Sequence, residues 1–268
     1  MKKVYMSEQE FIAQRDELGL NLLYAEDTAV LGKEYEIGNK AIPNRLAYQA
    51  MEECDGTAEG SPDTLTMRRY ERFAKGGAGI IWFEATAVLE EGRANPRQLY
   101  ITESNLDNFK KQVEDIKETA LQTNGYEPIV IMQATHSGRY SKPNGTAAPL
   151  IAYNNPIFEK DNPISADRIV TDEYLERVGE ALINGSLLAE KAGFDGVDIK
   201  CCHRYLNSEL LSAYDREDKN GVFEFNTDGH KMLYSPLLAE GETAEDFSWQ
   251  FTYIPVETTW NTDRFKFH

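Results

Sequence analysis

The chain has 268 residues, 41% hydrophobic and 27% charged, which is the composition of a globular protein rather than a disordered one. Its formal net charge of -17 disfavours nucleic acid and anionic membrane surfaces as partners, since both are bound through lysine and arginine. The three cysteines, Cys54, Cys201 and Cys202, suit no disulfide framework, so we expect a reducing compartment, the cytoplasm. We find no apolar signal sequence at the N-terminus and no apolar run of membrane-spanning length.

From about residue 43 to about residue 200, the sequence predicts alternating strands and helices. The predicted strands cover 44–51, 79–85, 128–133 and 194–199. Three amphipathic helices lie between them. Pro62 and Asp63 open the first, Ser104 is expected to cap the second, and Thr171 is expected to cap the third. Helices that connect successive strands predict a parallel sheet, and a (β/α)8 barrel is the closed form that we expect.

The C-terminal part does not continue this alternation. A complete barrel has eight strands in typically ~250 residues, whereas here four strands occupy some 200 residues. Beyond Val222, aromatic residues alternate with polar ones, as at Trp249, Phe251 and Tyr253, which is the pattern of half-exposed strands in a β-hairpin. We therefore divide the chain into 1–221, the N-terminal part of a barrel, and 222–268, a divergent tail.

The most informative segment is 192–206. Gly193 stands where a helix ends, and a short apolar strand follows it. Lys200, His203 and Tyr205 come directly after that strand. In parallel α/β proteins the C-terminal ends of strands carry the chemistry, and an ammonium, an imidazole and a phenol together can bind and protonate a carbonyl-type substrate.

Several motifs, in the right order, resemble the Old Yellow Enzyme family of FMN-dependent NAD(P)H oxidoreductases, in particular its 2,4-dienoyl-CoA reductase-like and NADH:flavin oxidoreductase branches. The first strand resembles one that usually ends in Pro-Met beside the flavin, with Ala50 in place of the proline. The segment 133–139, Gln-Ala-Thr-His-Ser-Gly-Arg, is similar to the family's Gln-Leu-x-His-x-Gly-Arg motif. The other matching segments are 76–88, 192–206 and 215–221.

The resemblance implies an ene-reductase chemistry in which NADH or NADPH reduces FMN, and the flavin passes hydride to the alkene of a small enone or enoyl substrate. Tyr205 matches the proton-donating tyrosine and His203 the second of two substrate anchors. Lys200 stands where many members have the first anchoring histidine. The residues implied on the flavin side are Ala50, Met51, Glu52, Ala85 and Gln133.

The sequence also departs from the family. We find neither the fifth strand, with its flavin-contacting arginine, nor the glycine-rich loops of the seventh and eighth strands, which hold the FMN phosphate. A half-barrel exposes strand edges and an apolar face, so it must form a homo-oligomer, be covered by its tail, or be unstable. The alternative is therefore a catalytically silent half-barrel that binds no flavin and is stabilised by self-association.

Two further kinds of site are disfavoured. A glycosidase-like barrel needs paired carboxylates, and Glu84 is the one strand-end carboxylate that the pattern places. We expect no metal site, because the adjacent Cys201 and Cys202 cannot easily converge on one ion. The acidic stretch Glu52, Glu53 and Asp55 is better explained as a solvated turn, and Cys54 as an inert buried thiol.

Overall fold

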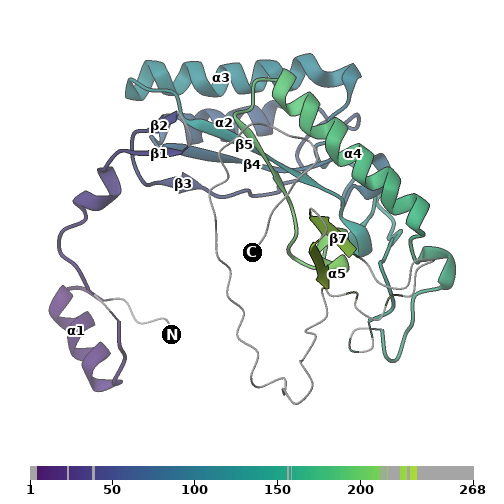
Figure 1. Ribbon diagram of the computed structural model, residues 1–268. Coiled ribbons are helices and arrows are strands. Elements are labelled where there is room, and N and C mark those ends of the chain that lie inside the picture. The colour runs from purple at the N-terminus through teal and green to yellow at the C-terminus, as the bar shows by residue number, and fades with distance from the viewer. Residues whose placement is uncertain are drawn as a thin grey trace.

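The computed structural model describes residues 5–22, 24–37, 40–155, 157, 159–211, 213, 216, 224–227 and 230–233. Its centre is a four-stranded parallel sheet in chain order, as the sequence predicts (Figure 1). The strands are β3 (Ala47–Tyr48), β4 (Ile80–Ala87), β5 (Ile129–Thr135) and β6 (Gly196–Ile199). The first strand is shorter than predicted. The side chain of Asn44 accepts the N–H of Leu46, so the chain bends where the prediction extended the strand.

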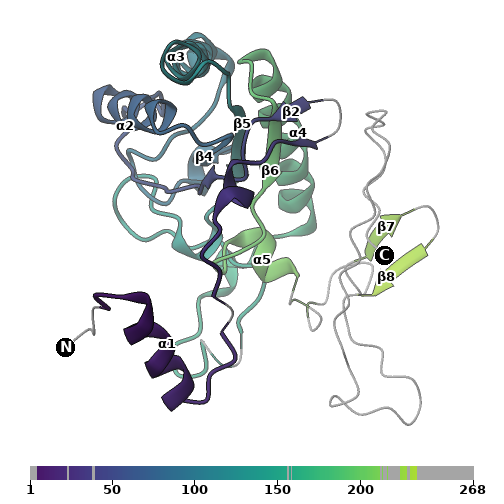
Figure 2. The same cartoon turned by 90° about the vertical axis from the view of Figure 1, so that its left-hand side faces the viewer.

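Three helices cover one face of this sheet (Figures 1 and 2). They are α2 (Thr64–Lys75), α3 (Leu106–Asn124) and α4 (Asp172–Lys191). Asp63 and Thr171 cap α2 and α4 through their side chains, as expected. The prediction that Ser104 caps α3 was wrong, because a 3-10 turn, η3 (Glu103–Asn105), precedes that helix. Thr102 and Asn105 form a reciprocal capping box around η3.

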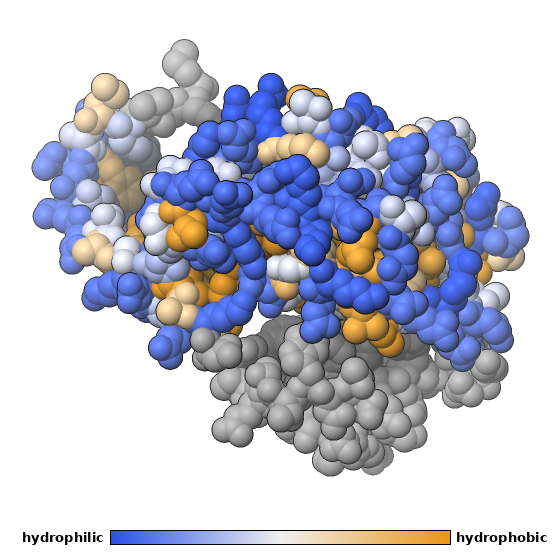
Figure 3. All heavy atoms as spheres, turned by 90° about the horizontal axis from the view of Figure 1, so that it is seen from above, coloured by the Kyte–Doolittle hydropathy of each residue, from blue (hydrophilic) through white to orange (hydrophobic). Residues whose placement is uncertain are grey.

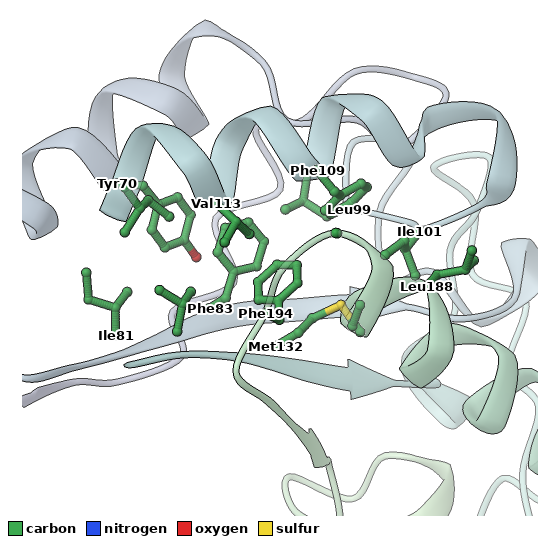
Figure 4. Close-up of a cluster of buried hydrophobic side chains, with 14 of the residues drawn as sticks. Tyr70, Ile81, Phe83, Leu99, Ile101, Phe109, Val113, Met132, Leu188 and Phe194 are labelled. Atoms are coloured by element: carbon green, nitrogen blue, oxygen red, sulfur yellow. The ribbon is translucent and has the colours of Figure 1, made fainter. Parts of the chain in front are cut away.

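The hydrophobic core lies between the sheet and these helices (Figure 4). Phe83 on β4 is fully buried and stacks on Tyr70 of α2 at a ring-centroid distance of 4.2 Å. Phe83 also meets the rings of Phe109 on α3 and Phe194 in the loop before β6 edge-on. Because strand side chains alternate, the residues between these core positions face the opposite side of the sheet.

That opposite side corresponds to the inner face of a barrel. Trp82, Ile131, Gln133 and Asp198 lie on it, and all four are half-buried. Asp198 accepts hydrogen bonds from the indole N–H of Trp82 at 3.1 Å and from the amide of Gln133 at 2.8 Å. A polar network therefore joins β4, β5 and β6 across this face.

The N-terminal region contains elements that the sequence did not predict. They are α1 (Glu8–Glu17), η1 (Ala29–Gly32), β1 (Tyr35–Ile37) and β2 (Lys40–Ile42). The helix α1 buries none of its residues, and β1 and β2 are three residues each, so these elements leave little hydrophobic pattern in the sequence. Lys40 of the β1–β2 hairpin forms an ion pair with Asp195, which ties the hairpin to the turn before β6.

The other short elements lie in the loops and the tail. They are η2 (Glu90–Gly92), η4 (Gly138–Tyr140), η5 (Ala166–Arg168), α5 (Leu206–Leu210), β7 (Glu224–Thr227) and β8 (His230–Leu233). β7 and β8 pair antiparallel, whereas the alternating aromatics at Trp249, Phe251 and Tyr253 lie outside the described residues. The surface seen in Figure 3 is mainly hydrophilic with separate hydrophobic spots. None of the described helices is long and apolar enough to cross a membrane.

Candidate functional site at the strand ends

The four parallel strands deliver their C-terminal ends to one edge of the sheet, and the predicted site residues come from these ends. In the strand register, Ala85 of β4 lies opposite Gln133 of β5, and Gln133 lies opposite Asp198 of β6. The three residues form a row across the sheet. Ala50 and Met51 follow β3 at the neighbouring strand end.

A compact cluster joins the ends of β3 and β6. The Glu52 carboxylate lies 3.7 Å from the Lys200 ammonium and accepts a 3.2 Å hydrogen bond from the Tyr205 hydroxyl. The Lys200 Nζ atom lies 4.1 Å from the centroid of the Tyr205 ring. Each of the three side chains therefore contacts the other two. The sequence predicted Lys200 and Tyr205 at one site and Glu52 near the flavin, but it gave no sign that Glu52 binds both Lys200 and Tyr205.

Burial governs the charges in this cluster. Only 5% of the Lys200 side chain and 14% of the Glu52 side chain are exposed. Burial raises the pKa of Glu52, and the positive charge of Lys200 partly opposes this shift. Burial, followed by the negative charge of Glu52, raises the pKa of Tyr205 well above its usual value. Tyr205 is therefore a protonated phenol at neutral pH, as a proton donor must be.

A tight turn links β6 to Tyr205. His203 and Arg204 both have positive φ, 59° and 56°, and the backbone N–H of Leu206 then bonds the carbonyl of His136 at 3.2 Å. The turn leaves His203 exposed, with its ring 6.5 Å from that of Tyr205 between centroids. His203 thus lies beside the cluster without joining its hydrogen bonds.

The flavin-side prediction falls on residues of mixed exposure. Ala85 is buried, Ala50 is half-buried, and 55% of Met51 is exposed. Gln133 donates its amide N–H to Asp198, and no described residue donates to its carbonyl oxygen. The amide oxygen of Gln133 could therefore accept an N–H at the edge of a planar ring.

A second ionic cluster lies behind the strand end. Arg69 of α2 forms ion pairs with both Asp55 and Glu84, and the Glu84 side chain is fully buried. Burial raises the pKa of Glu84 to about 7, although the charge of Arg69 opposes the shift. Glu84 also accepts the backbone N–H of Glu53 at 3.3 Å. Glu84 is thus engaged by Arg69 rather than paired with a second carboxylate across a cleft, which does not suit a glycosidase.

The acidic stretch after β3 does not converge on a cation. Glu52 is bound to Lys200 and Asp55 to Arg69, while Glu53 is exposed. Cys54 is half-buried rather than buried. It lies 3.7 Å from Glu52, and burial raises its pKa to about 12, so its thiol is a poor nucleophile. In the part of the chain that the structure describes, no three His, Cys, Asp or Glu residues could hold a metal ion together.

Comparison with known proteins identifies the family of this chain. Residues 31–221 match the sequence profile of the NADH:flavin oxidoreductase / NADH oxidase family. The chain belongs to this family. It is 26% identical to an NADPH dehydrogenase of Halalkalibacterium halodurans over 219 residues, which are 81% of this chain and 60% of that relative. It is 34% identical to the NADH:acrylate oxidoreductase of Vibrio harveyi over 206 residues, which are 72% of this chain and 19% of that protein.

Solved structures agree on the fold. Old Yellow Enzyme from Pichia sp. AKU4542 aligns with a TM-score of 0.57 at 21% identity, over 71% of this chain and 50% of that one. Morphinone reductase in complex with tetrahydroNAD aligns with the same score at 20% identity, over 71% of this chain and 54% of that one. The chain thus spans about half the length of these relatives, and its parallel sheet corresponds to the N-terminal part of their barrel.

The family's FMN can be compared with the residues present. The amide oxygen of Gln133 is placed to accept from a flavin ring, Ala85 beside it is buried, and Ala50 and Met51 follow the next strand end. The glycine-rich loops that we expect to hold the phosphate follow the seventh and eighth strands of a barrel, and no described residue corresponds to those strands. Among the described residues, those that could meet a flavin ring are thus present, whereas the strands whose loops would hold its phosphate are not.

Proposed function

We propose that this protein is an FMN-dependent oxidoreductase of the ene-reductase type, which passes hydride from NADH or NADPH to the activated alkene of a small enone or enoyl substrate. The observation that carries the proposal is the contact between buried Lys200 and Tyr205 at the strand ends, beside the row of Ala85 and Gln133, in a chain of this family. Bound FMN would supply the hydride chemistry.

The protein's own residues would orient the substrate and supply the proton. Tyr205 would donate its hydroxyl proton to the α-carbon of the alkene, because its raised pKa keeps it protonated. Lys200 and the exposed His203 would donate hydrogen bonds to the oxygen of the activating group. Gln133 would accept an N–H of the flavin ring, with Ala50, Met51 and Ala85 lining the ring.

The names of relatives are consistent with this substrate class. The protein from Vibrio harveyi is named for acrylate, a short alkene conjugated to a carboxylate, so its name supports the conjugated alkene and not the charge of the activating group. A solved neighbour is described as a complex of 2-naphthoyl-CoA reductase with 2-naphthoyl-CoA. Both are conjugated acyl compounds, and protonation next to the carbonyl is the step that Tyr205 would serve.

The experiment is to follow NAD(P)H-dependent reduction of 2-cyclohexenone in the presence of FMN. General acids typically contribute 10²–10⁴-fold, so Tyr205→Phe should lower alkene reduction by about a hundredfold or more, while reduction of the flavin by NAD(P)H continues. Tyr140→Phe is the matched control, because Tyr140 lies 5.9 Å from Tyr205 between ring centroids and bonds Arg204 instead of Glu52. Equal turnover by wild type and Tyr205→Phe would contradict the assignment.

A second function rests on a specific observation. Among the described strands, β3 and β6 each pair on one side only, and the inner face carries half-buried Trp82 and Ile131. We propose that the exposed edges are covered in a homo-oligomer, and such an assembly could persist without bound flavin. Light scattering on the purified protein distinguishes the cases: a colourless oligomer that turns over no alkene supports the silent alternative, and a flavin-bound protein with turnover excludes it.

A further inference from the structure

We propose that Glu52 sets the charge of the substrate that this site accepts. By neutralising Lys200, it selects acceptors whose activating group is an uncharged carbonyl, such as a ketone, aldehyde, ester, amide or thioester, over acceptors that carry a free carboxylate. The inference rests on the proposed function, because it concerns the acceptor that Lys200 and Tyr205 would bind.

The geometry gives Lys200 an internal partner. The Glu52 carboxylate lies 3.7 Å from Nζ of Lys200, and the pair is held in a buried environment where 5% of the lysine side chain is exposed. Glu52 also accepts the Tyr205 hydroxyl at 3.2 Å, so its position is fixed from two sides. A substrate carboxylate that approached Lys200 would therefore meet a lysine whose charge is already compensated.

On the solvent side, the exposed Arg204 is engaged by the hydroxyl of Tyr140, which lies beside Tyr205. On the side behind Glu52, no additional cation is left over among the described residues. Cys54 contacts Glu52 as a neutral thiol, and the next ionic cluster contains two carboxylates, Asp55 and Glu84, against one guanidinium, Arg69. A carboxylate that leaves water for such a site loses its hydration without gaining an unpaired cation, which is unfavourable.

An uncharged carbonyl oxygen avoids this penalty. A lysine ammonium has three N–H donors, so Lys200 can donate to a carbonyl oxygen while it remains paired with Glu52. Tyr205 contributes a hydroxyl whose proton is directed to Glu52 and becomes available when the hydroxyl rotates toward the ligand. The arrangement thus binds a neutral oxygen without breaking the ion pair.

The test compares binding of trans-cinnamate and trans-cinnamamide, which have the same skeleton and differ in charge. Dissociation constants come from ligand-detected NMR on the full chain supplied with FMN, a readout that needs no hydride transfer. Glu52→Gln removes the negative charge and keeps the shape. Glu53→Gln is the matched control, because Glu53 is the exposed neighbour and loses the same charge.

We expect wild type to bind the amide more tightly than the carboxylate. In Glu52→Gln, the ratio of the two dissociation constants should shift toward the carboxylate by about tenfold or more. A unit charge at roughly 4 Å in a partly buried site changes binding by at least that factor. Glu53→Gln should shift the ratio by less than about twofold. Adding Lys200→Met to Glu52→Gln should cancel the gain, because the cation that attracts the carboxylate is then absent.

An unchanged ratio in Glu52→Gln, or an equal shift in Glu53→Gln, would overturn the inference even if wild type reduces 2-cyclohexenone. If Glu52→Gln does not fold, the test uses Lys200→Met alone. In this variant the ratio of the two dissociation constants must move further against the carboxylate, and a ratio equal to that of wild type overturns the inference. A shift in binding without any alkene reduction would support the role of Glu52 in ligand charge and contradict the reductase function.

Discussion

Replacement of Glu84 by glutamine perturbs the buried ionic cluster behind the strand end. Glu84 is fully buried, and its carboxylate binds the Arg69 guanidinium and the backbone N–H of Glu53. Arg69 divides its charge between Glu84 and Asp55. One guanidinium therefore serves two carboxylates, and burial raises the pKa of Glu84 from 4.5 to about 7.

The raised pKa makes the free energy of unfolding depend on pH with a definite sign. The folded state binds a proton at Glu84 more tightly than the unfolded state does, so the stabilisation from proton binding is complete below pH 4.5 and is lost as the pH rises through about 7. A shift from 4.5 to about 7 corresponds to a loss of about 3 kcal/mol, since each pKa unit is worth about 1.36 kcal/mol. Glu84→Gln cannot titrate and should not show this loss.

The assay is urea unfolding at pH 4.5 and pH 8 for wild type, Glu84→Gln and Glu53→Gln. Glutamine replaces one of the two accepting oxygens of Glu84 by an amide nitrogen, but this cost is the same at both pH values and cancels in the difference between them. Between pH 4.5 and pH 8, Glu84→Gln should gain about 3 kcal/mol of stability relative to wild type. The exposed Glu53→Gln should follow the wild-type pH dependence. Parallel curves for wild type and Glu84→Gln would refute the reasoning.

Three further predictions concern the fold. Phe83→Ala removes a fully buried ring from the core and should lower the free energy of unfolding in urea by about 3–5 kcal/mol. Leu121→Ala, at a 47% exposed position, should lower it far less, and equal losses would contradict the core assignment. Burial lowers the pKa of His136 to about 4, so stability should be lost as the pH falls from 6.5 through about 4; His136→Gln should abolish this loss, and an unchanged acid dependence would exclude His136 as its source. Gly138→Ala places a Cβ 2.7 Å from the backbone nitrogen of Leu206 at φ 57°, so it should lower the midpoint of thermal unfolding by several degrees; an unchanged midpoint would show that the turn relaxes freely.

The sequence predicted the parts of the fold that bury apolar residues with a regular period. Phe83 lies in a continuous apolar run, so β4 was placed within two residues of its observed bounds. Phe109 lies in a helical pattern of apolar residues, so the buried face of α3 was predicted although its cap was not. The turn at Asn44, which shortens the first strand, depends on a side-chain hydrogen bond that leaves no hydrophobic period. The helix α1 buries nothing, so it could not be found in this way.

The candidate site was likewise predicted only in part. Lys200, His203 and Tyr205 were placed together because they follow one strand closely in sequence. The contact between Tyr205 and Glu52 spans 153 residues, and the parallel sheet alone brings the two together. Pattern reasoning predicts which strand ends share an edge of the sheet, but it does not predict which side chains there pair.

The most direct test of the central claim, that these strand ends form the ring side of a flavin site, is the visible spectrum of the purified protein after addition of FMN and removal of the free cofactor. The account predicts a retained flavin spectrum that bleaches on addition of NADH or NADPH. A colourless protein that leaves all added FMN in solution would contradict it.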